Sequence, residues 1–145
     1  MPTVYETHIE NRFPVQPNHA NSNGVLHGGN LMKWLDEVGG MAAMRFAGEI
    51  CVTAQVNSLA FERPIQIGDT ALVEAYVYDA GQTSVHVALQ ARRENPRTGE
   101  TEKTTESSFT FVAIDDDGSP VPVPDLSVET DEGERLRQRA IEADY

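Results

Sequence analysis

The spacing of apolar residues changes once along this chain, from a helical period to a strand period. Between about residues 30 and 47, apolar side chains recur every three or four positions, which is the spacing of one buried helix face. They include Leu31, Leu35, Val38 and Ala42, with Trp34 and Met41 beside them. Beyond this stretch, apolar residues alternate in four runs with the period of half-buried β-strands. The runs are Cys51 to Phe61, Ala71 to Val77, Thr83 to Ala91 and Phe109 to Ala113.

Turn-forming residues separate the four alternating runs. They are Gly68-Asp69, Ala80-Gly81, Asn95-Pro96 with Gly99, and Asp117-Gly118. The third and fourth runs should therefore form a hairpin, and a short strand is expected within Thr3 to Val15, ending before Pro14. The order strand, long helix and four strands predicts an α+β fold with one helix on one face of an antiparallel sheet. One helix cannot cover the ends of such a sheet, so we expect a second subunit to cover the remainder.

Length and charge limit the domain organisation and the partners. A chain of 145 residues favours a single domain over 1–145, with a core at about 3–124 and an acidic tail at 125–145. The net charge of −12 and the pI near 4.6 argue against nucleic acid as a partner. From Asp115 onward there are ten acids against three arginines. We interpret this segment as solvated surface that carries a polar, weakly amphipathic helix near Glu129 to Ala143.

The sequence shows no sign of export or of membrane insertion. No apolar run approaches the roughly 20 residues of a membrane helix, and the N-terminus has neither a basic region nor an apolar region of a signal peptide. Cys51 is the only cysteine, which excludes an intrachain disulfide framework and a cysteine-based zinc cluster. We therefore expect a cytoplasmic protein with no membrane partner.

The segment from Pro17 to Gly40, PNHANSNGVLHGGNLMKWLDEVGG, holds most of the candidate functional residues. Gly28-Gly29 at a helix start leaves backbone N–H groups accessible, and such a terminus attracts an anion or a developing oxyanion. Glycines that allow close helix packing are an equally common interpretation. Gly39-Gly40 should cost about 1 kcal/mol each relative to Ala, and we expect them to permit close approach of the sheet.

Asp36 and two asparagines are the other candidates in this segment. Asp36 is either a solvated residue on the outer helix face or a partly desolvated base. Asn21 and Asn23 serve most simply as turn residues, although an Asn amide can also orient a water or donate to a carbonyl oxygen. His19 and His27 lack a third metal ligand nearby, so a structural role is the alternative for both histidines.

With these residues in view, the sequence resembles the acyl-CoA thioesterases of the hotdog superfamily, in particular the cytosolic acyl-CoA hydrolase branch. The resemblance covers about residues 8 to 124. Its motifs are Ala20-Asn21 with Gly24, His27-Gly28-Gly29, Leu35-Asp36-Glu37, Val52-Thr53, the block FERPIQIGD at 61–69, Gly81-Gln82-Thr83-Ser84 and Phe111-Val112-Ala113.

The resemblance implies a sheet wrapped around one long central helix, and hydrolysis of acyl-CoA without a metal or organic cofactor. The catalytic pair that it implies falls on Asn21 and Asp36, which come from different subunits. Our own hypothesis is that the N–H of Gly28 or Gly29, aided by the helix dipole, binds the thioester oxygen. Geometry agrees with a shared site, because Asp36 lies about 9–12 Å along the helix axis from the helix start. We therefore expect a two-fold dimer with two equivalent sites. The resemblance further implies assembly of such dimers as a trimer of dimers. Whether Asp36 acts as a general base or as a nucleophile stays open.

The resemblance also suggests contacts to coenzyme A. They are His27, Thr53, Thr83 and Ser84, and the bases chosen for its phosphates are Arg92 and Arg93, followed by Arg63 and Lys103. The alternative for each of the bases is a solvated surface residue. The alternative for Thr83 and Ser84 is that they only start a strand, and Thr53 has a similar status.

Two rival functions remain. A hotdog hydratase or dehydratase would pair its catalytic Asp with a His five residues later, where this chain has Met41. A non-catalytic acyl-CoA-binding regulator would usually carry a DNA-binding segment, for which this chain has neither spare length nor basic charge.

Overall fold

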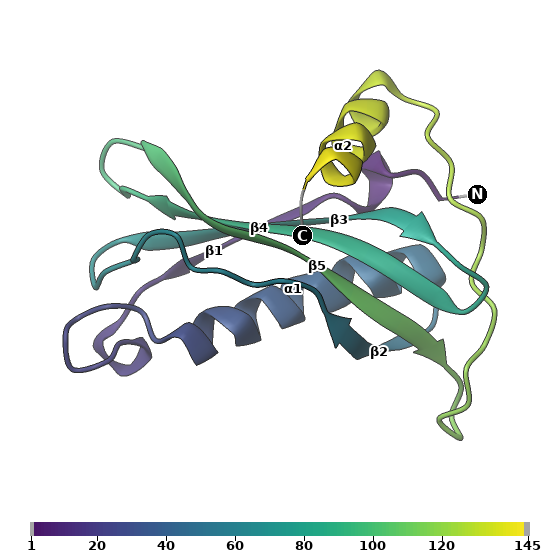
Figure 1. The fold of residues 1–145 in the computed structure, drawn as a ribbon, viewed down its shortest axis with the longest axis horizontal. Helices are drawn as coiled ribbons and strands as arrows, with labels where there is room; N and C mark the ends of the chain where they lie inside the picture. Colours follow the sequence, from purple (N-terminus) through teal and green to yellow (C-terminus); the bar gives the residue numbers. More distant parts are fainter. Residues whose placement is uncertain (1, 144–145) are drawn as a thin grey trace.

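A five-stranded antiparallel sheet wraps around one long helix in the computed structural model, which describes residues 2–143 (Figure 1). Along the chain, the strands and helices are β1 (Ile9–Pro14), α1 (Gly28–Ala47), β2 (Ile50–Val56), β3 (Thr70–Ala80), β4 (Ser84–Glu94), β5 (Thr101–Ile114) and α2 (Asp131–Glu142). Short 3₁₀ turns lie at Tyr5–Thr7 and Pro17–His19. The strand order is β1-β3-β4-β5-β2, so β1 and β2 form the two edges. The α+β hotdog architecture expected from the sequence is confirmed.

The start and end of α1 follow from local chemistry. His27 caps the N-terminus with its side chain, and Gly48 ends the helix in a left-handed conformation with φ 69°. Gly39 faces the sheet so closely that a Cβ there would lie 3.2 Å from Leu89 Cδ1 and 3.3 Å from the ring of Phe111. The close approach predicted for this glycine is therefore confirmed at Gly39.

The main core lies between α1 and the inner face of the sheet. The helix buries one face, and β3, β4 and β5 bury alternate residues against it. The largest members with less than 2% exposure include Phe109, Leu35, Val38, Val73, Val77, Val85 and Val87. Because each strand turns every second side chain inward, the alternation in the sequence identified this core.

The C-terminal tail covers the outer face of the sheet, whereas the sequence had suggested a solvated segment. α2 lies on the side of the sheet opposite to α1 (Figure 1). A second small core forms beneath it from Val4, Tyr76, Ala88 and Ala140. Polar contacts add to this packing, since Tyr76 Oη donates to Leu136 O at 2.7 Å. The tail helix is amphipathic enough to dock, despite its acidic composition.

Strand β2 is the least buried part of the sheet. Among its seven residues only Cys51 is partly buried, and that side chain packs on the main core. Val52 and Val56 are 43% and 41% exposed, although the alternating run to which they belong is typical of a half-buried strand. Within residues 2–143, β2 pairs only with β5 and leaves its other edge open. Such an edge is available for pairing with another chain.

Two strand lengths differ from the sequence-based expectation. β2 ends at Val56 and does not reach Phe61, and β5 begins at Thr101, well before Phe109. The N-terminal half of β5 turns Thr105 and Ser107 to the inner face, where they bind backbone carbonyls. A search for apolar alternation cannot find a strand of this kind. The expected hairpin between the third and fourth runs is confirmed as β4–β5.

Glu74 joins three segments of the outer face. Its carboxylate lies 2.7 Å from His8 Nε2 and 2.6 Å from Arg139 Nη2 on α2. Burial would raise the pKa of Glu74, but the hydrogen bond from His8 and the charge of Arg139 outweigh burial and hold it below the ordinary value of 4.5. A lowered folded-state pKa means that Glu74 stabilises the fold above about pH 4.5 and loses this contribution as the pH falls further.

We therefore predict that Glu74→Gln lowers the free energy of unfolding by roughly 1–3 kcal/mol at pH 7. The difference from the unsubstituted protein should shrink as the pH is lowered from 4.5 through the folded-state pKa of Glu74, because the folded protein then loses the charge as well. Urea unfolding at pH 7 and at a series of acidic pH values measures this. Glu10→Gln is the matched control, because Glu10 belongs to the same cluster but is exposed. Equal losses for both variants would contradict the assignment.

Candidate active site

The loop before α1 is fastened to the helix by backbone and side-chain hydrogen bonds. His19 O accepts from His27 N and from Asn30 Nδ2, both at 2.9 Å. The His19 ring packs edge-on against Trp34 with its centroid 5.0 Å away, and its Nδ1 accepts from Gln16 N. The structural interpretation of His19 is therefore supported, and its contacts fix the loop relative to the helix start.

The first backbone amides of α1 differ in their availability. His27 Nδ1 accepts the N–H of Gly29 at 3.1 Å, and the N–H of Asn30 bonds to His27 O at 2.9 Å. The N–H of Gly28 has no hydrogen-bond acceptor among residues 2–143. A helix N-terminus carries a partial positive charge at this point. Of the two glycines considered from the sequence, Gly28 thus presents the free donor.

Asn21 uses its side-chain oxygen to shape the loop. Asn21 Oδ1 accepts from Asn23 N at 2.9 Å and from Val25 N at 3.2 Å. Its amide Nδ2 donates no hydrogen bond within the described residues. The turn role and the catalytic role are therefore compatible, because one atom holds the loop while the exposed amide remains available.

Asp36 lies on the side of α1 that borders β2. Its Oδ1 accepts a hydrogen bond from Thr53 Oγ1, which fixes the carboxylate against the open edge of the sheet. On α1 it belongs to a row at spacing of four, Gly28, Met32, Asp36, Gly40 and Met44, in which no residue is fully buried. The hydrogen bond between Asp36 and Thr53 was not foreseen, because sequence periodicity does not show which strand residue lies opposite a helix residue.

Asp36 and Gly28 of one chain are too far apart to act on one atom. Eight residues of straight helix separate them, or about 12 Å along the axis. The structure thus places Asn21 and the Gly28 N–H at one end of α1, and Asp36 with Thr53 near its middle. The two groups therefore lie at separate positions along one chain.

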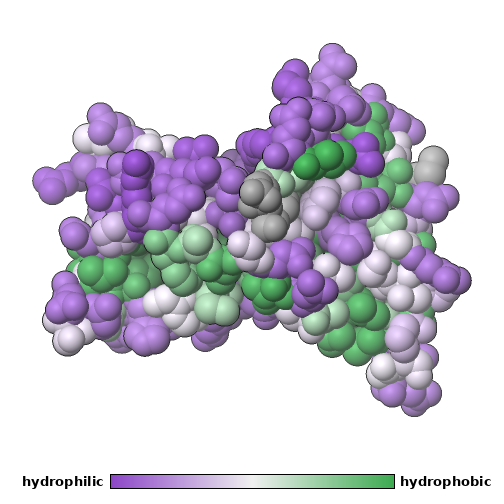
Figure 2. Space-filling model, in the orientation of Figure 1, coloured by the Kyte–Doolittle hydropathy of each residue, from purple (hydrophilic) through white to green (hydrophobic). Residues whose placement is uncertain are grey.

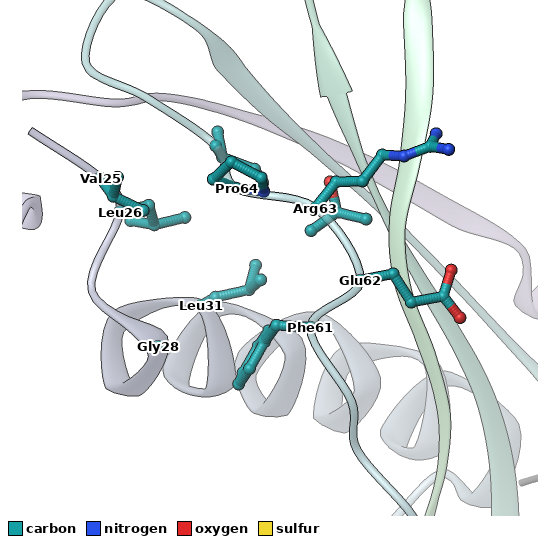
Figure 3. A pocket seen from close by; sticks show the side chains of 10 residues that line it. Val25, Leu26, Gly28, Leu31, Phe61, Glu62, Arg63 and Pro64 are labelled. Atoms are coloured by element: carbon teal, nitrogen blue, oxygen red, sulfur yellow. The ribbon is translucent and has the colours of Figure 1, made fainter.

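A cavity of about 310 Å³ opens beside the start of α1. Figure 3 shows it between the helix and the loop that carries Phe61 to Ile65. Its walls are mainly apolar and include Val25, Leu26, Leu31, Phe61, Pro64 and Ile65. The charged ends of Glu62 and Arg63 point away from it (Figure 3). The ring of Phe61 would lie 3.4 Å from a Cβ at Gly28, so the pocket reaches the free helix terminus.

The residues predicted to contact coenzyme A fall into two groups. Ser84 begins β4 and Thr83 directly precedes it, close to the level of Thr53, since Val85 pairs with Phe111 and Phe111 pairs with Thr53. Arg92 and Arg93 lie near the other end of β4, about 26 Å further along the strand. Within one chain the two groups cannot bind the same phosphate.

Each base chosen for phosphate binding already has a polar partner. Arg93 pairs with Asp69 at 3.7 Å, Arg63 with Glu102 at 3.5 Å and Lys103 with Glu106 at 3.5 Å. Arg92 donates to Gln90 Oε1 at 3.0 Å. As successive strand residues, Arg92 and Arg93 face opposite sides of the sheet, so they do not form one binding pair.

Two other groups of reactive side chains do not add chemistry to this site. Burial raises the pKa of the Cys51 thiol to about 11, so the thiol stays protonated near neutral pH and is a poor nucleophile. Ligand atoms of His8, Glu10 and Glu74 lie within 4.8 Å of one another on the outer face. Arg139 already supplies the positive charge to Glu74, so we interpret this cluster as the attachment of α2.

Comparison with known proteins identifies the family. The model of the thioesterase superfamily matches residues 23–100. YkhA of Bacillus subtilis, described as an acyl-CoA thioester hydrolase, is 35% identical over 94% of this chain and 80% of its own length. This chain therefore belongs to the thioesterase superfamily. In the part of the chain that is described, no helix is long and apolar enough to cross a membrane.

Solved structures with the same fold include two relatives of particular use here. An acyl-CoA hydrolase from Staphylococcus aureus, in complex with butyryl coenzyme A and coenzyme A, superimposes with a TM-score of 0.87 at 32% identity, covering 97% of this chain and 85% of that one. A hexameric acyl-CoA thioesterase without ligand gives a TM-score of 0.87 at 33% identity, covering 97% and 92%.

The Staphylococcus aureus enzyme has also been solved with an asparagine, an aspartate or a threonine replaced by alanine. The three altered positions are 15 and 17 residues apart along that chain. Asn21, Asp36 and Thr53 have the same residue types and the same spacing.

The capping role of His27 leads to a prediction about stability. His27→Ala removes the acceptor for the Gly29 N–H and should lower the free energy of unfolding by about 1 kcal/mol. His27→Asn should restore most of this loss, because an Asn side chain caps a helix in the same way. Thermal unfolding of the three proteins measures the effect. Equal destabilisation by both substitutions would show that the imidazole stabilises the fold by another contact. The predicted role of His27 in binding coenzyme A stays a prediction.

Proposed function

We propose that this chain is an acyl-CoA thioester hydrolase whose active sites each combine residues of two subunits. The observation that carries the proposal is the free Gly28 N–H at the N-terminus of α1, which opens onto an apolar pocket. A backbone donor at a helix terminus stabilises the oxyanion that forms when a thioester carbonyl is attacked. The relatives described as acyl-CoA hydrolases support this substrate class.

Asn21, Asp36 and Thr53 are the proposed polar residues of the site. Their match in type and spacing to the three substituted positions of the Staphylococcus aureus enzyme supports the assignment. Asp36 acts on the substrate, and Thr53 is a positioning residue because it holds Asp36 Oδ1. Asn21 donates through its amide, either to the attacking water or to the carbonyl oxygen.

The dimer follows from the distance between the half-sites and from the exposure of β2. Since one helix holds Gly28 and Asp36 about 12 Å apart, the second half of each site must come from another copy. The open edge of β2 and its exposed Val52 and Val56 support an interface beside Asp36. Figure 2 shows hydrophobic patches along the lower half of the molecule, where α1 and β2 lie in Figure 1. The hexameric relative supports further assembly as a trimer of dimers.

The proposed reaction uses only the protein, water and substrate. The thioester oxygen accepts the Gly28 N–H of one subunit, and Asp36 of the other subunit approaches the carbonyl carbon. The carboxylate either takes a proton from water, so that hydroxide attacks, or attacks directly to form an anhydride that water then cleaves. In both routes the C–S bond breaks, and the thiolate of coenzyme A leaves and is protonated. The acyl group leaves as the free acid.

The proposal also includes a cytoplasmic location for the enzyme and a contact between Arg63 and a phosphate of coenzyme A. A cytoplasmic enzyme fits the lone, unpaired Cys51. Arg63 is the base nearest to the pocket, since it lines its rim. A phosphate there would compete with Glu102 for the exposed guanidinium of Arg63, and such surface pairs are weak.

Asp36→Asn is the direct test of catalysis. It should lower kcat for acyl-CoA hydrolysis by at least about 100-fold and leave the Tm nearly unchanged, since Thr53 can still donate to the amide oxygen. Glu37→Gln is the matched control, because it removes an exposed carboxylate from the next residue of the same helix, and should keep full activity. Thiol release from a panel of acyl-CoAs reports turnover. Binding without thiol release in the unsubstituted protein would favour the acyl-CoA-binding regulator.

Subunit mixing tests the shared site. Asn21→Asp keeps the side-chain oxygen that shapes the loop and removes the amide donor, so it should inactivate without unfolding. Coexpression of Asn21→Asp and Asp36→Asn chains in equal amounts places half of the dimers in the mixed state. Each mixed dimer then has one site with both residues intact, which should restore about a quarter of the unsubstituted activity. No recovery would place both residues in one chain's site.

A further inference from the structure

One row of residues along α1 combines exposed apolar side chains with the two separated groups of the proposed site. The row has a spacing of four, so that successive members are neighbours on the helix surface: Gly28, Met32, Asp36, Gly40 and Met44. Met32 and Met44 are 41% and 37% exposed. Together with the exposed strand β2 beside it, this row forms an apolar surface of the kind that another chain covers.

The two groups of the proposed site locate the two-fold axis on this row. In a two-fold dimer, each residue of a helix is level with the residue of the partner helix that lies equally far beyond the axis. Gly28 of one chain and Asp36 of the other must meet at one thioester, so the axis has to pass midway between these positions. The midpoint is Met32, about 6 Å from each of them along the helix.

Gly40 indicates independently that another chain approaches this row. A glycine inside a helix is destabilising relative to alanine, so it needs a reason. Gly39 has one within the chain, because a Cβ there would press on Leu89 and Phe111. A Cβ at Gly40 would make only an ordinary contact, with Phe111 Cε1 at 3.8 Å. Within residues 2–143, packing therefore does not require a glycine at position 40.

We infer that the two chains of the dimer pack antiparallel along α1 with the two-fold axis at Met32. Each Met32 side chain then contacts its own copy and lies between the two active sites. Gly40 is the gap that admits the loop of the partner chain, with its Asn21, to Asp36. The inference rests on the proposed hydrolase function, because the shared site sets the position of the axis. Gly40 is thus a positioning residue that touches no substrate.

The position of Gly40 along the helix fits this gap. Gly40 lies one turn beyond Asp36, about 6 Å further from the axis, and is therefore level with the space one turn before the helix start of the partner. Figure 1 shows that the loop between the turn at Pro17–His19 and α1 lies beyond the start of the helix. A side chain at Gly40 would meet this loop and keep Asn21 away from Asp36.

Opposite charges at Met32 test whether this residue meets its own copy. Met32→Glu and Met32→Lys each place like charges on both sides of the axis, which is costly at an interface. Each variant alone should therefore raise the dissociation constant of the dimer by at least about tenfold. Coexpression of the two variants should recover the dimer, because opposite charges then face each other. Light scattering over a dilution series measures the mass, and thiol release should follow it.

Met41→Glu and Met41→Lys are the matched controls. Met41 is 38% exposed on the same helix, but it follows Lys33 and Glu37, an exposed ion pair, in a different row. These variants should keep the mass and the thiol release of the unsubstituted protein. Dissociation of the Met32 variants without recovery on coexpression would place Met32 against another part of the partner and overturn the inference. An unchanged dimer in both Met32 variants would overturn it as well.

Substitutions at Gly40 test the gap. Gly40→Ala and Gly40→Leu introduce better helix formers, so the helix content measured by circular dichroism should not fall. Thiol release should nevertheless decrease with side-chain size, by at least about tenfold for Gly40→Leu, because the partner's Asn21 is displaced. Full thiol release from Gly40→Leu would overturn the role of Gly40. Absence of thiol release from the unsubstituted protein with every acyl-CoA would instead overturn the proposed function, while the masses of the Met32 variants would still locate the axis.

Discussion

The packing of α1 against the inner face of the sheet determines where every part of the candidate site can lie. The helix is continuous over 20 residues, and its buried face is fixed by contacts such as that of Gly39 with Leu89 and Phe111. Once that face is buried, the row that contains Gly28 and Asp36 must lie along β2. The rise of 1.5 Å per residue then fixes the separation of the two groups. The proposal that a second subunit completes each site therefore rests on helix geometry.

The rest of the site depends on hydrogen bonds that attach two loops to this frame. Asn30 and His27 hold the loop before α1 through His19 O. Thr105 and Ser107 hold the loop after β2 through backbone carbonyls. Neither loop has a regular hydrogen-bond ladder of its own, so these side chains replace it. As a result, the pocket between the loops has walls of fixed position beside the helix terminus.

Much of the fold was predictable because apolar periodicity records which side of an element is buried. The bounds of α1 differ from expectation by two residues at its start, and the inner faces of β3 and β4 agree with the alternating runs. The start of β5 was missed because its inner residues are Thr and Ser, which are buried by hydrogen bonding. α2 was found, but its docking was not, since composition suggested solvation and the contact of Arg139 with Glu74 joins residues far apart in the sequence.

The candidate site was less predictable, because its residues could be found but their contacts could not. Asn21, Gly28 and Asp36 stood out by residue type and by their position around a helix start. The choice of Gly28 over Gly29 required the contact with His27, and the role of Thr53 required its position opposite Asp36.

Charge presents the remaining physical problem, because the chain carries −12 and its proposed substrate is an anion. Long-range attraction cannot guide such a ligand to the protein as a whole, so binding must depend on local groups. The bases near the pocket are held by surface carboxylates, as in Arg63 with Glu102. Because exposed ion pairs contribute little stability, a phosphate can replace the carboxylate at small cost. The neutral contacts around the thioester, the Gly28 N–H and the apolar walls, would then contribute most of the specificity.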